Sequence, residues 1–344
     1  MSSVVLEVIL FIVGLICLVK GGDWFVDGSC GIAHRFNMPE ILIGATVVSI
    51  GTTIPEVMVS ATAALTAGAS DMAYGNAIGS IICNTALVAA ITMAVRPALV
   101  ERKALKMPML FFFCAAIFYA AVAYITGFFA RTVGLVLLAG FVVYMVLAVK
   151  EAIAGNKGKD EEKQAEVSEI NKAAESNDSL NEAKLPFKES IAYEVLLLIL
   201  GAAVIAVGAR LLVNNGTLLA EAAGVPQSVI ALTFVALGTS LPELVTAITA
   251  LVKGHSDLSL GNVIGANLFN LVLVSGLACT LAPFHIPVEK TIAGMNASLV
   301  VDVPLMFAVM LIMCVPSMLK GKLYRAQGIS LLALYVGYVI FQFI

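Results

Sequence analysis

Two glutamates in the middle of long apolar segments are the residues best suited to chemistry in this chain. Glu56 ends the stretch GATVVSIGTTIPE, and Glu243 ends the similar stretch ALGTSLPE. An acidic side chain at the centre of a bilayer costs about 2.5–3.5 kcal/mol on insertion scales. Neither segment carries a Lys or Arg in its middle that could neutralise the charge. A pair of protonated structural glutamates is the alternative, but paired acids facing a cation fit the pattern better.

A proline directly precedes each glutamate, at Pro55 and Pro242. Proline has no N–H and its ring crowds the preceding turn, so the carbonyl four residues earlier loses its donor. A backbone carbonyl without a donor is costly in lipid and must find another partner, such as a cation. Each expected kink therefore presents free backbone oxygens about one turn before a carboxylate. The carbonyls concerned are those of Gly51, Thr52, Gly238 and Thr239.

Further polar residues accompany the glutamates at helical spacing. Ser49, Thr52, Thr53, Glu56 and Ser60 lie on one face of an expected helix. The following segments add asparagines, which serve either an ion site or hydrogen bonding between helices. The candidate ion-site residues are Glu56, Glu243, Thr52, Thr239, Asn84, Asn270, Thr53, Ser240, Ser80, Ser49 and Asn267.

The ligand atoms of this candidate site are all oxygens. Such a set suits a hard cation, Ca²⁺ above all, since Ca²⁺ takes about 6–8 oxygens in flexible geometry. Na⁺ can use the same oxygens, whereas Mg²⁺ prefers to keep several waters. Cys30 and the other five cysteines form no CxxC pair and are interpreted as packing residues. His34, His255 and His285 have no metal-binding spacing and are interpreted as loop and interface residues, so no resident cofactor is expected.

The composition requires an integral membrane protein. The 344 residues are 60% hydrophobic and only 12% charged, too few charges to cover a water-soluble globule of this size. The net charge of −3 gives no reason to expect a nucleic-acid partner. The first apolar run is expected to be a retained span and not a signal peptide. The ten expected spans are 4–20, 40–66, 72–94, 107–126, 131–149, 191–213, 226–252, 257–282, 297–316 and 326–343.

The segment 150–189 differs from the rest, because it is rich in lysine and acidic residues and poor in large apolar ones. It is expected to be a solvated linker. The positive-inside rule then puts both termini outside and this linker in the cytoplasm, as expected for a multi-pass protein of a prokaryotic inner membrane.

An internal repeat relates the two sides of this linker. The offset is 187 residues through the glutamates and 186 residues afterwards. Five spans per half invert the second half relative to the first, so the expected fold is all-α, with ten helices in two inverted-topology five-helix repeats. Broken helices of such repeats form substrate sites near the bilayer midplane. The expected divisions are 1–149, 150–189 and 190–344, and the matched residues include Gly14 and Gly201, Gly21 and Gly208, Pro55 and Pro242, Glu56 and Glu243, Gly75 and Gly261, Asn76 and Asn262, and Asn84 and Asn270.

The motifs GTTIPE and GTSLPE, with GNAIGSIICN and GNVIGANLFN, resemble the alpha repeats of the cation/calcium exchanger superfamily, in particular its prokaryotic sodium/calcium exchanger branch. This resemblance covers the whole chain and implies Na⁺-coupled Ca²⁺ antiport by alternating access. It also implies that the first and sixth spans slide past a fixed core. By the same resemblance, Glu56 and Glu243 ligate Ca²⁺ with the carbonyls of Thr52 and Thr239, and the adjoining Na⁺ and water positions are lined by Thr53, Ser80, Ser240, Asn84 and Asn270.

Two departures from the family pattern bear on the counter-ion. Ala266 stands where relatives often have serine, which leaves one Na⁺ position weak or absent, and Asn270 stands where potassium-dependent relatives tend to have aspartate. Exchange of Ca²⁺ or another cation for H⁺ is the runner-up. An intramembrane enzyme is a third alternative. The sequence disfavours it, because it lacks a catalytic arrangement such as paired aspartates, a serine with His or Lys, or a zinc motif. A passive channel would conduct without a counter-ion.

Overall fold

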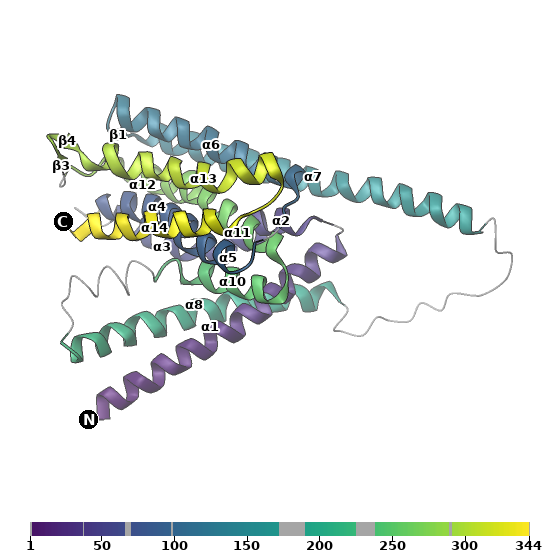
Figure 1. Cartoon of the computed structure of the whole chain (residues 1–344), viewed down its shortest axis with the longest axis horizontal. Coiled ribbons are helices and arrows are strands. Elements are labelled where there is room, and N and C mark those ends of the chain that lie inside the picture. Colours follow the sequence, from purple (N-terminus) through teal and green to yellow (C-terminus); the bar gives the residue numbers. More distant parts are fainter. Residues whose placement is uncertain are drawn as a thin grey trace.

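The computed structural model describes residues 2–36, 38–65, 70–97, 99–171, 190–224, 238–288 and 291–343. These residues are predominantly helical, and most helices run roughly along one axis (Figure 1). Eight of the described helices are long and apolar enough to cross a membrane by length and composition. They are Val4–Arg35, Glu40–Leu65, Met72–Val95, Arg102–Ile125, Arg131–Ala152, Ile191–Ala222, Ser256–Leu281 and Ser298–Lys320.

Helices, several of them interrupted by π-helical turns (η), form nearly all of the chain before the linker. The elements are α1 (Ser2–Arg35), α2 (Glu40–Ile43), η1 (Gly44–Val48), α3 (Ser49–Leu65), α4 (Ser70–Cys83), η2 (Asn84–Ala89), α5 (Ala90–Val95), α6 (Arg102–Ile125), β1 (Phe128–Phe129) and α7 (Arg131–Asn171).

The described part after the linker is also mainly helical. Its elements are α8 (Ile191–Ala222), α10 (Leu241–Lys253), α11 (Ser256–Phe269), η5 (Asn270–Val274), α12 (Ser275–Leu281), β2 (Phe284–His285), β3 (Thr291–Ile292), β4 (Met295–Asn296), η6 (Ser298–Asp302), α13 (Val303–Lys320) and α14 (Arg325–Phe343). Two short antiparallel pairs, β1 with β2 and β3 with β4, are the named strand pairs among the described residues.

The expected first and sixth spans were too short. α1 continues from the predicted end at 20 to Arg35, and α8 continues from 213 to Ala222. Polar residues ended each apolar run in the sequence, but the helices persist because such side chains find partners. Asp27 Oδ1 in α1 lies 2.7 Å from Lys253 Nζ, and Asn215 Nδ2 in α8 donates to the carbonyl oxygen of Leu211 at 2.7 Å. Arg35 Nε lies 2.9 Å from Glu194 Oε2 and Arg35 Nη2 lies 3.0 Å from Glu194 Oε1, which joins the end of α1 to the start of α8.

The expected seventh and tenth spans are not among the eight long apolar helices. Residues 226–237 lie outside the described residues, and Gly238–Ser240 form a turn before α10 begins. The prediction that Pro242 kinks the interior of a helix was therefore wrong, because Pro242 lies in the first turn, where a missing N–H costs no helical bond. Pro55, in contrast, lies inside α3 as expected. The tenth expected span corresponds to the 19-residue α14.

Glycines let α1 and α8 pack closely along each other in opposite directions. A Cβ at Gly14 would lie 3.0 Å from the carbonyl oxygen of Gly208, and a Cβ at Gly21 would lie 3.0 Å from that of Gly201. The partner number falls along α8 as the residue number rises along α1, so the helices are antiparallel (Figure 1). Small residues at such crossings allow backbone contact between membrane helices.

A second close crossing brings α11 against the segment formed by α2, η1 and α3. A Cβ at Gly261 would overlap the carbonyl of Ile41, and a Cβ at Gly265 would lie 2.6 Å from the Cα of Ala45. α3 also packs against α4, α10 and α12. These elements form a compact group beside the α1–α8 pair, and each carries part of the candidate site or lies next to it.

We predict that Gly261→Ala destabilises the protein by about 1–3 kcal/mol, because the new methyl group can only be accommodated by separating two backbones. Thermal unfolding of the detergent-solubilised protein measures this as a lower melting temperature. The control is Gly337→Ala on α14, where no described atom lies within 4 Å of the added Cβ. Equal melting temperatures for the two variants would contradict the crossing described here.

Candidate functional site

The carboxyl groups of Glu56 and Glu243 lie together in the group of helices around α3. Both side chains are 0% exposed. Glu56 is in the middle of α3 and Glu243 in the first turn of α10, and the charge of one carboxyl acts on the other. Among the described residues, none of their four carboxyl oxygens has a hydrogen-bond partner, and neither residue forms an ion pair.

The position of Glu243 at the start of α10 offsets part of the cost of burying a charge there. The N-terminal N–H groups of a helix carry partial positive charge, which stabilises a carboxylate in the first turn. Ser240, the residue before the helix, makes no side-chain capping bond to it. The segment before Glu243 is thus a turn leading into a helix end, whereas the segment before Glu56 is a helix containing a proline.

Two buried asparagines each begin a π-helical turn. Asn84 begins η2 and Asn270 begins η5, and both residues are 0% exposed. A π-helical turn inserts one extra residue, and such bulges are frequent at functional sites. The side-chain oxygen and nitrogen of both amides are buried without a partner among the described residues. η2 contacts α10 and η5 contacts α3, so each free amide lies on an element packed against a helix that carries a glutamate.

The hydroxyl candidates divide into free and engaged groups. Thr53 Oγ1 and Ser240 Oγ are buried without a hydrogen-bond partner in the described part of the chain. Ser49 Oγ lies 2.7 Å from the carbonyl oxygen of Gly44 and 2.9 Å from that of Asn262, so it contributes to the helix crossing. Of the other three hydroxyl candidates, Thr52 donates a hydrogen bond to Asn262, Ser80 is buried, and Thr239 borders a cavity.

Asn262 and Asn76, matched in the repeat, both hold α3. Asn262 Oδ1 accepts a hydrogen bond from Thr52 Oγ1 at 3.2 Å. Asn76 Nδ2 donates to the backbone oxygen of Glu56 at 3.1 Å and to Ser60 Oγ at 2.8 Å. Neither was among the candidate ion-site residues, although both stand in the repeated Gly-Asn motif. The structure indicates that they position α3.

Asn267 occupies a different environment from Asn270. Its Nδ2 donates to Thr85 Oγ1 at 2.7 Å and lies 3.2 Å from Met310 Sδ. These contacts connect α11 with η2 and α13. The candidate Asn267 thus has its amide nitrogen engaged between helices, while its oxygen has no partner among the described residues.

Cys83 is a neighbour of the site that the sequence did not single out. It is the last residue of α4, directly before Asn84, and its thiol lies within electrostatic range of both glutamates and near Ser240. The hydroxyl of Tyr335 lies 3.7 Å from its sulfur. The only available signal was its position beside the repeated asparagine, since cysteines in apolar segments usually serve packing.

The arrangement fits a hard cation. Leaving a buried polar group unpaired costs about 1–3 kcal/mol. The carboxyl, amide and hydroxyl oxygens that lack partners all belong to residue types that coordinate Ca²⁺ and Na⁺. A cation among them would satisfy several of these groups at once and neutralise both carboxylates.

A cavity of about 690 Å³ reaches the backbone just before both glutamates. It lies between α3 and α8 and is bordered by Gly51, Pro55, Arg210, Thr239 and Pro242, with apolar side chains making up most of the remaining wall. The segments expected to offer backbone oxygens therefore face open space on the side of α8.

Comparison with known proteins gives consistent results. The family model described as "Sodium/calcium exchanger protein" matches residues 6–150 and 193–344. An uncharacterized membrane protein of Methanocaldococcus jannaschii is 35% identical over 329 residues, covering 95% of this chain and 94% of that protein. The sodium/calcium exchanger MaX1 of Methanosarcina acetivorans is 30% identical over 362 residues, covering 97% and 98%. A solved structure of the sodium-calcium exchanger NCX_Mj superposes with a TM-score of 0.76 at 33% identity, covering 98% of this chain and 99% of that one.

The free carboxyls predict a stabilising effect of Ca²⁺ that depends on them. At a Ca²⁺ concentration 100 times its dissociation constant, binding adds about 2.7 kcal/mol to the stability of the folded state. The melting temperature of the unmodified protein should rise with Ca²⁺, and Glu56→Gln should remove the rise. Glu101→Gln, a substitution at an exposed residue before α6, is the control and should keep it. A full Ca²⁺ response in Glu56→Gln would exclude Glu56 as a ligand.

Proposed function

This chain belongs to the sodium/calcium exchanger protein family, and we propose that it exchanges Na⁺ for Ca²⁺ by alternating access at a site centred on Glu56 and Glu243. Sodium/calcium antiport follows from the family match and from the full-length likeness to exchangers. The residues of the site and the movement are our proposals.

The observation that carries the site assignment is the pair of buried carboxyl groups that have no hydrogen-bond or ion-pair partner in the part of the chain that the structure describes. They come from matched positions in the two halves and are close enough for each charge to act on the other. Two negative charges neutralise one Ca²⁺ or two Na⁺. The same oxygens therefore serve either ion in turn, which is a physical basis for exchange through competition.

The remaining candidate residues lie in three parts of the proposed site: the Ca²⁺ position, the Na⁺ and water positions, and the edge. The backbone oxygens of Thr52 and Thr239 contribute to the Ca²⁺ position. The adjoining Na⁺ and water positions are formed by Thr53, Ser80, Ser240, Asn84 and Asn270. Ser49 and Asn267 act at the edge of the site, because the structure engages their side chains between helices. No enzymatic reaction is part of this proposal.

We propose that α1 and α8 move together past the group of helices around α3. Their antiparallel glycine contacts and the Arg35–Glu194 pair make them one unit. They correspond to each other in the repeat, which supports two inverted five-helix halves, 1–149 and 190–344, joined by the linker 150–189. Sliding of this pair would change access from the cavity beside α8 to the carboxyl groups.

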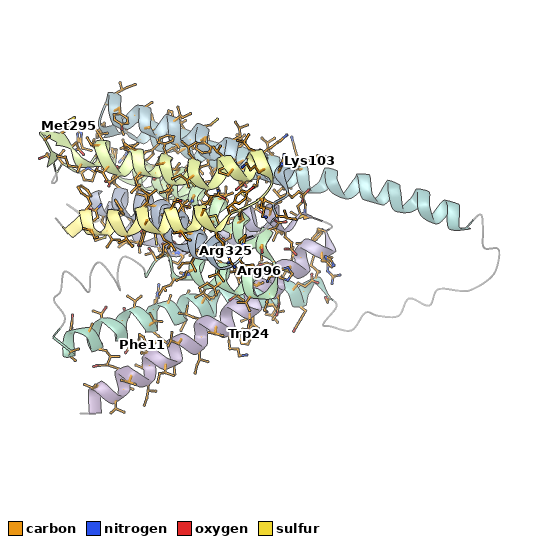
Figure 2. The ribbon with its side chains drawn as sticks, viewed as in Figure 1. Phe11, Trp24, Arg96, Lys103, Met295 and Arg325 are labelled. Carbon is orange, nitrogen blue, oxygen red and sulfur yellow. The ribbon has the colours of Figure 1, made fainter. Side chains whose placement is uncertain are left out.

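We propose that both termini face outside and the linker faces the cytoplasm of a prokaryotic cell. Both ends of the chain lie at one end of the bundle, and α7 projects from the other (Figure 1). Met295 lies at the end with the termini, whereas Arg96, Lys103 and Arg325 lie farther toward the end from which α7 projects (Figure 2). A concentration of basic residues on one side favours the cytoplasm for that side.

Transport assays test the site directly. Vesicles loaded with Na⁺ should take up radiolabelled Ca²⁺, and Glu56→Gln or Glu243→Gln should each abolish uptake, because one negative charge cannot neutralise the divalent ion. Glu101→Gln is again the control and should transport normally. Normal uptake by either glutamine variant would refute the site assignment. Uptake that ignores Na⁺ and follows a pH gradient would replace Na⁺ with H⁺ as the counter-ion.

Ala266 provides a second test of the Na⁺ positions. It is fully buried on α11, in the motif where relatives often carry a hydroxyl. If the absent hydroxyl weakens one Na⁺ position, Ala266→Ser should lower the Na⁺ concentration that half-inhibits Ca²⁺ uptake. Ala278→Ser, at an equally buried position on α12, is the control and should leave it unchanged. The same Na⁺ dependence in both variants would argue against a Na⁺ position at 266.

A further inference from the structure

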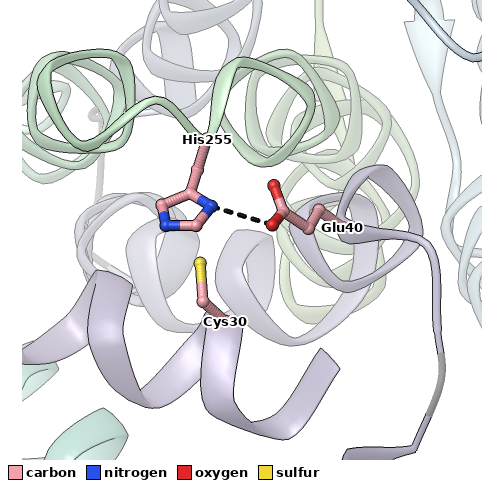
Figure 3. A group of neighbouring side chains, drawn as sticks. All are labelled: Cys30, Glu40 and His255. Carbon is pink, nitrogen blue, oxygen red and sulfur yellow. Dashed lines mark hydrogen bonds and ion pairs between the residues drawn. The ribbon is translucent and has the colours of Figure 1, made fainter. Parts of the chain in front are cut away.

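A second group of potential metal ligands lies away from the carboxyl pair. Cys30 on α1, Glu40 on α2 and His255 just before α11 point toward one another (Figure 3). One ligand atom from each lies within 4.8 Å of the others. His255 Nδ1 is 2.8 Å from Glu40 Oε1. No spacing in the sequence indicates this group, because Glu40 and His255 are separated by 215 positions.

We propose that Cys30, Glu40 and His255 form a binding site for Zn²⁺ or a similar borderline divalent cation, distinct from the transport site. Thiolate, imidazole and carboxylate are the usual zinc donors, at about 2.3, 2.0–2.1 and 2.0–2.2 Å from the metal. Ligand atoms in such a tetrahedron are about 3.3–3.6 Å apart. The ligand atoms now lie within 4.8 Å of one another, so to reach this geometry the longer separations would have to shorten by about 1 Å and the 2.8 Å separation between His255 and Glu40 would have to lengthen slightly. The fourth position remains for water.

The two sites offer different ligand atoms and therefore prefer different metal ions. The transport site offers oxygens of carboxyl, amide and hydroxyl groups, which suit Ca²⁺ and Na⁺. The Cys30 site offers one sulfur and one imidazole nitrogen, which favour Zn²⁺ and its neighbours over Ca²⁺. Ca²⁺ should therefore compete poorly at the Cys30 site.

The surroundings of the Cys30 site admit and attract a cation. The side chains of His255 and Glu40 are 32% and 34% exposed, so an ion can reach them. The negative charges of Glu40 and Asp27 act on Cys30, opposed by Lys253, which itself forms an ion pair with Asp27 at 2.7 Å. Asp257 lies within electrostatic range of Glu40, and its Oδ1 is buried without a hydrogen-bond partner in the described chain.

A metal bound here would fasten α1 to the neighbouring helices. Cys30 belongs to α1, whereas Glu40 and His255 belong to α2 and to the connection between α10 and α11. Bound Zn²⁺ would thus add a strong cross-link between the α1–α8 pair and the group around α3. Inhibition of exchange by Zn²⁺ follows only if that pair moves as proposed above, whereas metal binding itself does not depend on the proposed function.

Binding is tested first, on the purified full chain with Co²⁺ as a spectroscopic substitute for Zn²⁺. The unmodified protein should show a thiolate-to-cobalt charge-transfer band that Zn²⁺ removes by displacement. Cys30→Ser should abolish this band. His255→Gln removes a direct ligand and should weaken Co²⁺ affinity by at least about tenfold, since altering even the residues that support metal ligands costs about 10–100-fold. Cys17→Ser, also on α1, is the control and should keep the band.

The experiments distinguish metal binding at Cys30, Glu40 and His255 from inhibition of Ca²⁺ uptake by the bound metal. No thiolate band in the unmodified protein, or a band that persists in Cys30→Ser, would overturn the site. If Cys30→Ser fails to fold, the Co²⁺ affinity of His255→Gln tests the site instead, and an unchanged affinity would overturn it. Zn²⁺ should inhibit Ca²⁺ uptake by the unmodified protein and not by Cys30→Ser. Co²⁺ binding without inhibition would overturn the cross-link and leave the site standing, and neither result depends on whether Glu56 is a Ca²⁺ ligand.

Discussion

Two carboxyl groups are buried among the helices with no basic partner in the described part of the chain, and the surrounding structure has to meet the cost of that burial. Glu56 and Glu243 are fully buried, close enough to repel each other when ionised, and without an ion pair among the described residues. Two like charges in a medium of low polarity are strongly unfavourable. A cation that arrives from solution and leaves again relieves this cost only while it is bound. The free amides and hydroxyls around the pair would complete its coordination.

Close backbone contacts hold that arrangement together. α11 crosses the segment from α2 to α3 at Gly261 and Gly265, and Asn262 accepts a hydrogen bond from Thr52 at the same crossing. Separately, glycines pack α1 against α8. The molecule therefore has one unit that carries the carboxyls and another that borders the cavity beside them. This division suits a transporter, because access can change while the ligands stay together.

Much of this could be predicted from the sequence, since it depends on composition and repetition. Apolar runs predicted the positions of the eight long apolar helices, and the sequence repeat matched Glu56 with Glu243 and Asn84 with Asn270. The π-helical turns at the two asparagines were not predictable, because they depend on helix packing and not on a local motif. The predicted lengths of α1 and α8 were too short, because polar residues in their extensions find partners that the sequence does not reveal, such as Arg35 with Glu194 and Asn215 with the carbonyl of Leu211. The prediction of a kink at Pro242 was wrong because a proline occurs both at kinks inside helices and in the first turn of a helix, and the sequence alone does not distinguish the two. Cys30, Glu40 and His255 were missed because only the fold brings them together.

Ca²⁺ coordination by Glu56 and Glu243 is tested most directly by a crystal structure of the protein soaked with Ca²⁺. One Ca²⁺ should appear between Glu56 and Glu243, with at least one oxygen of each carboxyl about 2.3–2.6 Å from the ion. Oxygens from Asn84, Asn270 or the neighbouring backbone should complete its shell. A Ca²⁺ ion bound elsewhere in the membrane region, with neither carboxyl in its coordination shell, would contradict the account.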